Sequence, residues 1–268
     1  MAGSFTKDIE FFDRTTGGSA RSGLPSGVSV LIAEKINKLI TGIPSKNILD
    51  IGTGNGEIGI ELGKLSNQYI GFDKSESALV DFKGRTGFNA SKLHLIKHDG
   101  NLPWPLGDNT INVFFSSRAL HLLKIKHAIK EIQRVRMDSP VYIFLGRVER
   151  DFNSVKSTLR RTLRTTLKQF NYLPRSGHKE RSQLFEELKS SGGEVGVPIS
   201  VAKWTTYHSP RKYLDAWKNS TGLAGIHMDP AMKSKVLEEV LVEASKMYKD
   251  IGKAFESEEW YELSYIKL

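Results

Sequence analysis

The stretch from Ile48 to Gly56 constrains the fold of this chain most strongly. Four residues of a short apolar strand, Ile48 to Ile51, lead directly into a turn that contains Gly52, Gly54 and Gly56, and a helical pattern follows. Glycines let the backbone bend sharply there and let a ligand approach the main chain closely. A strand, a glycine turn and a helix in this order predict a βαβ unit built around a parallel sheet.

The same alternation continues along the chain. Apolar residues at helical and strand spacing alternate from residue 28 to residue 146, which predicts an α/β, doubly wound, mostly parallel sheet of seven strands with helices on both faces. The predicted strands cover residues 46–51, 68–72, 93–97, 110–116, 140–146, 199–206 and 260–268. The predicted helices cover residues 28–39, 57–64, 75–82, 122–135, 152–170 and 182–189, with a further helix that begins at Asp229 and Pro230.

We expect four segments along the sequence. Residues 1–45 form an N-terminal lid and first helix, and residues 46–148 form a cofactor-binding, Rossmann-like core. Residues 149–198 form a basic helical insertion that covers the substrate side, after the fifth strand. Residues 199–268 supply the remaining strands and helices and complete the same domain.

Composition excludes several classes of protein. The 268 residues contain no cysteine, so disulfides, thiolate zinc sites and a cysteine nucleophile are excluded. The start of the sequence carries acidic residues and no long apolar stretch, and no apolar run approaches the roughly 20 residues of a membrane helix. We therefore expect a soluble, cytoplasmic protein with no membrane partner. The 39 basic and 30 acidic residues leave a charge of +9, which suits nucleic acid, anionic lipid or an acidic substrate equally.

Three acidic residues predict what the glycine turn binds. Asp50 lies in the first strand, and Asp73 and Asp99 end the second and third strands, at the edge where open α/β sheets bind ligands. A carboxylate beside the turn would repel a pyrophosphate and suits a ligand with positive charge. In the register set by Gly52, Glu57 stands where a dinucleotide site has its third glycine, which disfavours a nicotinamide oxidoreductase. A turn with no ligand, and acids that only cap helices or turns, remain alternatives.

Successive motifs resemble those of class I S-adenosylmethionine-dependent methyltransferases. Within that class, the sequence is similar to the small-molecule branch that includes trans-aconitate, malonyl-carrier and ubiquinone/menaquinone methyltransferases. The motifs are Leu49 to Gly56, Gly71 to Asp73, His98 to Gly100 with Leu102 to Trp104, and Asn112 to His121. The segment Arg21 to Pro25 and the tail from Ser209 to Trp217 extend the resemblance. Ser22 and Leu24 depart from the family pattern, where a proline and an aromatic residue are usual.

The resemblance implies roles for individual residues, with S-adenosylmethionine as the cofactor and no metal. Asp50 would favour the amino and sulfonium end of the cofactor through its charge, and Ser116 and Arg118 would border the methyl group. The other implied cofactor-binding residues are Arg21 near the N-terminus; Gly52, Thr53 and Gly54 at the methionine end; Asp73 and Lys74 at the ribose and adenine edge; and Asp99 and Gly100 at the adenine.

Two further features bear on the reaction. His121 follows the fourth strand and is the candidate general base for a hydroxyl substrate, with a packing or capping histidine as the alternative. On the helix predicted at 152–170, a cationic stripe that includes Arg160 and Arg164 would attract an anionic substrate, a carrier-bound one or RNA, unless it is only a solvated face.

We expect a methyltransferase that acts on a small anionic or polar metabolite, with oxygen favoured over nitrogen as the acceptor atom. An RNA methyltransferase is the second interpretation, because of the charge. Against it, the fourth strand ends in Ser116-Ser117-Arg118-Ala119 and lacks the Pro-Pro-aromatic loop common in base-nitrogen methyltransferases, and no appended RNA-binding motif is present. A non-catalytic binding module with the same fold is another alternative.

Overall fold

The structure, a computed structural model, describes residues 23–85, 90–173 and 177–268. These residues divide into two compact units. The core unit contains residues 23–85, 90–148, 177–202 and 261–268, and the helical unit contains residues 149–173 and 203–260. Residues 203–260 therefore join the segment after the fifth strand, which differs from the expectation that 199–268 complete the first domain. Strands β5, β7 and β10 contribute residues to both units.

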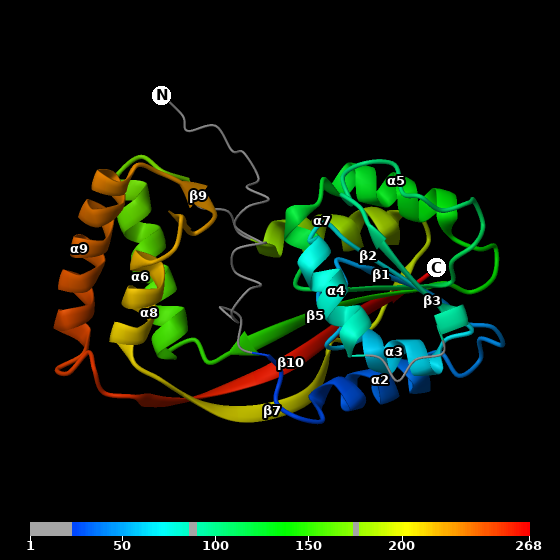
Figure 1. The fold of residues 1–268 in the computed structure, drawn as a ribbon, viewed down its shortest axis with the longest axis horizontal. Helices are drawn as coiled ribbons and strands as arrows, with labels where there is room; N and C mark the ends of the chain where they lie inside the picture. The colour runs from blue at the N-terminus through cyan, green and yellow to red at the C-terminus, as the bar shows by residue number, and fades with distance from the viewer. Residues whose placement is uncertain (1–22, 86–89, 174–176) are drawn as a thin grey trace. The chain divides into compact units, whose positions relative to one another are not determined.

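One sheet of eight strands organises the core unit (Figure 1). Its order is β3-β2-β1-β4-β5-β10-β6, and β7 pairs with β10 beside this path. The pairs from β3 to β5 are parallel and β6 pairs antiparallel with β10, so the predicted mostly parallel α/β sheet is confirmed. The strands are β1 (Asn47–Ile51), β2 (Gln68–Asp73), β3 (Leu93–Lys97), β4 (Val113–Ser117), β5 (Tyr142–Arg150), β6 (Glu194–Val195), β7 (Ile199–His208) and β10 (Phe255–Lys267).

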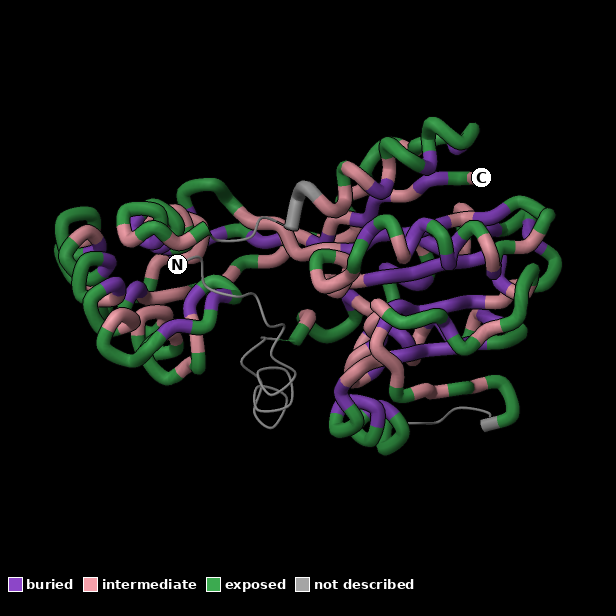
Figure 2. Tube along the Cα trace, turned by 90° about the horizontal axis from the view of Figure 1, so that it is seen from above, coloured by how far each residue is buried: buried purple, intermediate pink, exposed green. Residues whose placement is uncertain are grey.

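Helices cover both faces of this sheet. The helices α2 (Val28–Leu39), α3 (Gly59–Leu65) and α4 (Glu76–Gly84) lie on one face, and α5 (Ile125–Val135) and α7 (Gly177–Ser190) lie on the other. Two short 3-10 helices, η1 (Ala90–Lys92) and η2 (Leu120–Leu122), precede β3 and α5. Apolar stripes bury the inner side of each helix, and Figure 2 shows the strands between them as largely buried.

The packing between α5, α7 and the sheet fixes one side of the core. Ile129 and Ile132 of α5, with Leu184 of α7, pack against Phe114 and Leu145 of the sheet. All five side chains are nearly inaccessible to solvent. Burying each such side chain stabilises the fold by about 1.5–3 kcal/mol, which is why the apolar spacing alone predicted these elements.

The helical unit is built from α6 (Val155–Gln169), α8 (Pro210–Lys218) and α9 (Pro230–Met247), with a short hairpin of β8 (Gly222–Leu223) and β9 (Ile226–His227). Leu163 and Leu167 of α6 pack against Val236 and Val240 of α9. Asp229 caps α9, as predicted, by accepting a hydrogen bond from the backbone N–H of Met232 over 2.9 Å. The apolar stripe of α6 therefore packs inside the helical unit.

Phe152 departs from the predicted apolar stripe of α6. Its side chain is 71% exposed, because it precedes the N-cap residue Ser154 and so lies outside the helix. The guanidinium of Arg161 lies over its ring at 3.7 Å from the centroid. In the described part of the chain, no helix combines the length and the apolar character needed to cross a membrane.

Candidate functional site

The glycine turn after β1 is held against the end of β2. Backbone N–H groups of Gly52 and Thr53 donate to the carbonyl oxygen of Phe72 over 2.9 and 3.1 Å. Gly52 has a φ of 74°, and a Cβ at this position would overlap the side chain of Ala119. Gly54 has a φ of 57°, and a Cβ there would meet open space. The turn thus presents backbone to open space at Gly54, as a cradle for a ligand requires.

Asp73 clamps the turn from the end of β2. One carboxylate oxygen accepts from the backbone N–H of Gly54 and the other accepts from that of Ser75, both over 2.8 Å. Each oxygen keeps a further lone pair for another donor. The side chain is only partly buried, so it can also accept from a ligand hydroxyl beside the glycine turn.

Asp99, two residues after the end of β3, is joined to the end of β2 through Lys74, the residue after Asp73. The ammonium of Lys74 donates to Oδ2 of Asp99 over 2.8 Å, and Asn101 donates to Oδ1 from its backbone N–H over 3.0 Å. Partial burial opposes ionisation of Asp99, but the bonds from Lys74 and Asn101 outweigh it and lower its pKa. The neighbouring Gly100 packs closely against Leu123 and Phe72. Lys74 and Asp99 therefore form one ionised pair.

Asp50 lies beneath the turn. Its side chain is 2% exposed, and its Oδ2 accepts hydrogen bonds from Tyr69 over 2.6 Å and from Thr53 over 2.9 Å. Burial raises the pKa of Asp50 to about 7, against the lowering effect of these two bonds, and the charge of Asp73 adds to the rise. The sequence predicts a carboxylate that acts through its charge, whereas the buried carboxyl group of Asp50 is only partly ionised near neutral pH.

The end of β4 and the residue after it contribute three polar side chains, those of Ser116, Ser117 and Arg118. Ser116 is buried and donates its hydroxyl to the carbonyl of Ile51 over 3.0 Å. Arg118 has a φ of 61°, unusual for a side chain other than glycine, and pairs with Glu57 over 3.1 Å. Tyr261 of β10 donates to the hydroxyl of Ser117 over 2.9 Å.

Two further predicted site residues are His121 and Arg21, of which the structure describes only His121. His121 lies on η2 and is exposed. Arg21 lies outside the described residues, so its predicted role is not placed by the structure. Across the described residues, no group of three or more histidine, aspartate or glutamate side chains is arranged to hold a metal ion.

Arg160 and Arg164 lie on α6 in the helical unit. Both residues are exposed overall and follow the buried Leu159 and Leu163 by one position each, so they flank the apolar stripe. Burial of its guanidinium lowers the pKa of Arg160, and the charges of Arg150 and Arg164 act in the same direction. The same unit contains a second polar cluster that the sequence analysis did not find. There the buried carboxylate of Glu259 accepts from the Nε of Arg150 over 2.9 Å, and the ammonium of Lys156 lies 3.8 Å from the same oxygen.

His208 and Tyr213 complete this second cluster, with ring centroids 5.3 Å apart. The Nε2 atom of His208 is buried, and no described residue forms a hydrogen bond with it. Burial lowers the pKa of His208, and the charges of Lys156 and Lys212 act in the same direction, against that of Glu259. The surroundings of His208 therefore disfavour the protonated imidazole.

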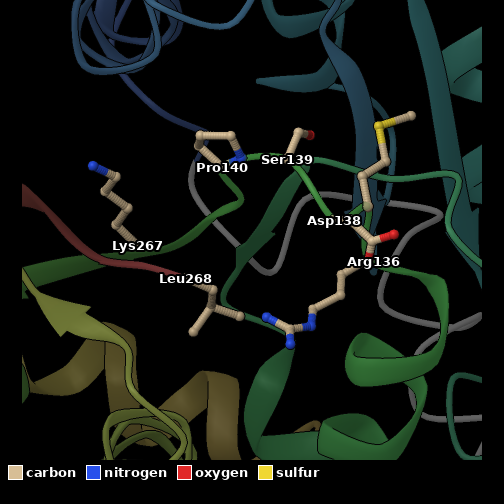
Figure 3. Close-up of a pocket in the computed structure, with 7 residues that line it drawn as sticks. Arg136, Asp138, Ser139, Pro140, Lys267 and Leu268 are labelled. Atoms are coloured by element: carbon tan, nitrogen blue, oxygen red, sulfur yellow. The ribbon is translucent and has the colours of Figure 1, made fainter.

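A pocket of about 340 Å³ lies elsewhere on the core unit (Figure 3). It is lined by Arg136, Met137, Asp138, Ser139, Pro140, Lys267 and Leu268. Leu268 exchanges two backbone hydrogen bonds with Val141, the residue before β5, so the pocket lies where β5 begins. The glycine turn lies at the opposite, carboxyl edge of the parallel strands, which is the edge that binds ligands in this fold.

Sequence reasoning missed several residues of these sites. Glu57 entered only as a departure from a dinucleotide pattern, and its ion pair with Arg118 spans 61 positions of the chain. Tyr69 lies in the strand predicted at 68–72 and Tyr261 in the strand predicted at 260–268, and strand spacing marks neither as a hydroxyl donor. No local pattern marks these three side chains, because each meets its partner only through the sheet.

The sheet order, the glycine turn after β1 and the acidic side chains at and after the ends of β2 and β3 define a Rossmann-like domain. Comparison with known families narrows this class. Residues 48–137 match the family model described as a methyltransferase domain. The match indicates a methyltransferase domain over these residues. No curated protein matches the chain by sequence.

Solved structures share the fold at low sequence identity. A putative methyltransferase from Bacillus halodurans is 15% identical with a TM-score of 0.52, over 87% of this chain and 98% of that one. A putative type II methyltransferase from Anaeromyxobacter dehalogenans is 11% identical with a TM-score of 0.52, over 88% and 94%. The [4+2]-cyclase SpnF is 14% identical with a TM-score of 0.50, over 96% and 91%. Similarity at this level concerns the fold, and the reaction must be argued from the site.

Proposed function

We propose that this protein transfers a methyl group from S-adenosylmethionine to a small anionic or polar molecule, with oxygen as the favoured acceptor atom. The observation that carries the proposal is the bond from the backbone N–H of Gly54 to Asp73, which joins the open glycine turn to an acid able to accept further hydrogen bonds. The cofactor supplies a methyl group on a positively charged sulfur, which is a good leaving group.

The residues at the strand ends suit a cationic nucleoside. Backbone at Gly52, Thr53 and Gly54 would hold its methionine end, because a Cβ at residue 54 would fill the open space there. Asp73 would accept from the ribose hydroxyls through its remaining lone pairs. Lys74, Asp99 and Gly100 would form the adenine edge.

Other residues would act near the methyl group. Ser116 supports the end of β1 through its bond to Ile51, and Arg118 with Glu57 borders the turn. The task of these groups is to hold the acceptor in line with the bond that breaks and to keep water out. A hydroxyl acceptor would pass its proton to a base, for which His121 is our candidate, whereas a carboxylate acceptor needs none.

An anionic acceptor is supported by the cations of the helical unit. Arg160 and Arg164 are exposed on one side of α6, and we propose that they bind the negative group of the substrate. In the second cluster, Arg150 and Lys156 share the single carboxylate of Glu259, which leaves an excess of positive charge beside His208. Such an excess favours an anion over a neutral molecule.

Calorimetric titration with S-adenosylhomocysteine tests the cofactor site. We expect micromolar binding to the wild-type protein and a loss of at least about tenfold, or about 1.4 kcal/mol, in Asp73→Ala. The matched control is Asp81→Ala, which changes an exposed carboxylate on α4 and should leave the affinity unchanged. Equal affinity in Asp73→Ala and the control would remove the ribose assignment.

A labelled-methyl experiment tests the reaction and the acceptor. The protein is incubated with methyl-labelled S-adenosylmethionine and a fractionated cell extract, and labelled products are identified by mass spectrometry. A labelled small carboxylate or hydroxyl compound is the expected product. Label in RNA, with binding that weakens steeply as salt rises, would favour the RNA interpretation. Cofactor binding without any labelled product would favour a non-catalytic binding module.

A further inference from the structure

Three oxygen atoms form a closed triangle under the glycine turn. Oδ2 of Asp50 lies 2.6 Å from the hydroxyl of Tyr69 and 2.9 Å from that of Thr53, and the two hydroxyls lie 2.7 Å apart. All three side chains are buried. Each distance is that of an O–H···O hydrogen bond.

The number of protons in this triangle depends on the state of Asp50. Tyr69 and Thr53 each supply one hydroxyl proton, which satisfies two of the three edges. An ionised Asp50 draws both of these protons toward its Oδ2, and the 2.7 Å contact between the hydroxyls is left without one. A protonated Asp50 supplies the third proton, so every edge then carries a hydrogen bond. The geometry therefore matches a neutral carboxylic acid at residue 50.

Two glycines make room for the triangle. A Cβ on Gly59, the first residue of α3, would overlap the hydroxyl of Tyr69. Gly71 stands opposite Asp50 in the register of β1 and β2, and a Cβ there would press on Thr53 at 3.0 Å. The space beside Asp50 is thus filled by Tyr69 and Thr53.

The triangle is connected to the ligand-binding turn. Thr53 belongs to the turn, and its backbone N–H is bonded to Phe72, next to Asp73. The charged and titratable groups that act on Asp50 are Tyr69 and Thr53 through their bonds, and Asp73 through its negative charge. Burial raises the pKa of Tyr261 on β10, and the charge of an ionised Asp50 acts in the same direction. A positive charge bound at the turn would favour ionisation of Asp50.

We propose that the buried triangle holds Asp50 as a neutral acid in the ligand-free protein, that Tyr69 is a positioning residue whose hydrogen bond favours loss of this proton, and that Asp50 releases the proton to solvent when a cationic donor binds at the glycine turn. The O–H bond of Asp50 breaks, its electron pair stays on Oδ2, and the proton passes to the buffer. The inference rests on the proposed function for the identity of the donor. The neutral acid in the ligand-free protein is independent of it.

Proton release is measured by titration calorimetry in two buffers of different ionisation enthalpy, with S-adenosylmethionine and S-adenosylhomocysteine as the ligands. Only the first carries a positive sulfur, and both carry the same amino group. Because Asp50 has a pKa of about 7, we expect release of up to about half a proton more for S-adenosylmethionine at pH 7. The affinity for S-adenosylmethionine, divided by that for S-adenosylhomocysteine, should rise between about pH 6 and pH 8 and then level off.

Asp50→Asn is the matched control, because it keeps the size of the side chain and removes its titration. It should abolish both the extra proton and the pH dependence of the ratio. Equal proton release for the two ligands in the wild-type protein would overturn the coupling. Failure of both ligands to bind would instead overturn the proposed function, so the two failures are distinguishable.

Tyr69→Phe tests the positioning role, since it retains the ring that packs edge-on against Phe82 with centroids 6.0 Å apart. Loss of the bond that favours the ionised form should move the midpoint of the affinity ratio to higher pH. Gly59→Ala should move it in the same direction by displacing the hydroxyl, and should add little in the Tyr69→Phe background. An unchanged midpoint in Tyr69→Phe would show a purely structural role and overturn the assignment.

The ligand-free state is measured directly by carbon-13 NMR of labelled aspartate carboxyl groups, with the Asp50 signal assigned by its absence in Asp50→Asn. We expect this signal to titrate near pH 7 in the wild-type protein and at higher pH in Tyr69→Phe. A signal that remains ionised down to pH 5 would overturn the neutral acid.

Discussion

Arg150 and Glu259 form a charged pair in the helical unit, in which the Nε of Arg150 donates to the buried Oε1 of Glu259 over 2.9 Å. The carboxylate side chain is 7% exposed, and Lys156 is its second cationic neighbour. Asp151, the residue after Arg150, bonds through its side chain to the backbone N–H of Glu258 over 2.8 Å. The end of β5 is therefore joined to β10 by a hydrogen bond to the backbone and by an ion pair.

Removal of this buried carboxylate should destabilise the helical unit. We expect Glu259→Ala to lower the free energy of unfolding by about 3 kcal/mol, because the half-buried Arg150 then lacks a partner. The matched control is Glu258→Ala on the same strand, whose ion pair with Lys203 is exposed and should contribute less than about 1 kcal/mol. Urea denaturation followed by tryptophan fluorescence measures both, since Trp204, Trp217 and Trp260 belong to this unit. Equal effects of the two variants would contradict the prediction.

A second charged network, in the core unit, allows a similar comparison of a buried with an exposed carboxylate. Oε2 of Glu131 accepts from the backbone N–H of Trp104 and from Arg134, both over 2.7 Å, and the side chain is 6% exposed. Asp108 also pairs with Arg134 over 2.7 Å but is 75% exposed. We expect Glu131→Ala to cost about 3 kcal/mol of unfolding free energy and Asp108→Ala less than about 1 kcal/mol.

The pH dependence of this network has a definite sign. The bonds from Arg134 lower the pKa of Glu131, against some burial, so the folded protein binds the proton of this group less readily than the unfolded chain. Its stabilising contribution is present above the unfolded pKa and is lost as the pH falls through the lower folded pKa. The difference in stability between wild type and Glu131→Ala should therefore shrink below about pH 4.5. A constant difference down to pH 2 would contradict this.

The raised pKa of Asp50 predicts the opposite dependence of stability on pH. Burial raises its pKa to about 7 from an unfolded value of 3.8, so the folded protein binds this proton more tightly than the unfolded chain. The contribution of Asp50 to the free energy of unfolding is fully present below about pH 4. It is lost as the pH rises to about 7, by at most about 1.4 kcal/mol per pH unit. The comparison of wild type with Asp50→Asn isolates this group from the other carboxylates. Thermal unfolding across pH 4–8 should show the two stability curves diverge up to pH 7, and parallel curves would contradict a raised pKa.

The sequence predicted those parts of the fold that depend on local patterns. The helix expected at Val28–Leu39 has those bounds in the structure, because its apolar spacing and the following Gly-Ile-Pro turn act locally. The glycine turn and the three strand-end acids also came from spacing along single strands. The ion pair of Lys74 with Asp99 did not, since each strand end meets the other only after the sheet has formed.

The division into two units shows the limit of such patterns. The stripe of Leu159, Leu163 and Leu167 predicted an amphipathic helix but not the surface that it covers. That surface comes from α9, more than 60 positions later in the chain, whose own stripe includes Val236 and Val240. Periodicity identifies an apolar face, and long-range packing decides its partner. The same limit applies to Tyr69 under the glycine turn. An aromatic residue within an apolar strand indicates the core, and its spacing does not reveal that its hydroxyl donates to Asp50.

Charge reversal on α6 tests the proposed substrate interaction. We expect Arg160→Glu with Arg164→Glu to raise the KM for an anionic acceptor by at least about tenfold, because two attractive charges become repulsive. The affinity for S-adenosylhomocysteine, measured by calorimetry, should stay within about twofold, since Arg160 and Arg164 are not among the residues proposed to hold the cofactor. The acceptor is the compound found in the labelled-methyl experiment, and the kinetics are measured at two salt concentrations.

The matched control reverses two exposed lysines of the same unit, Lys235→Glu with Lys246→Glu on α9, and so makes an equal change in net charge. If only the overall field matters, both double variants will raise KM equally and the effect will vanish at high salt, because exposed charges are screened beyond about 8–10 Å. If Arg160 and Arg164 contact the substrate, only their reversal will raise KM, and part of the effect will persist at high salt. An unchanged KM in both would place the cations of α6 on a solvated face, and the anionic acceptor would then depend on Arg150 and Lys156 alone.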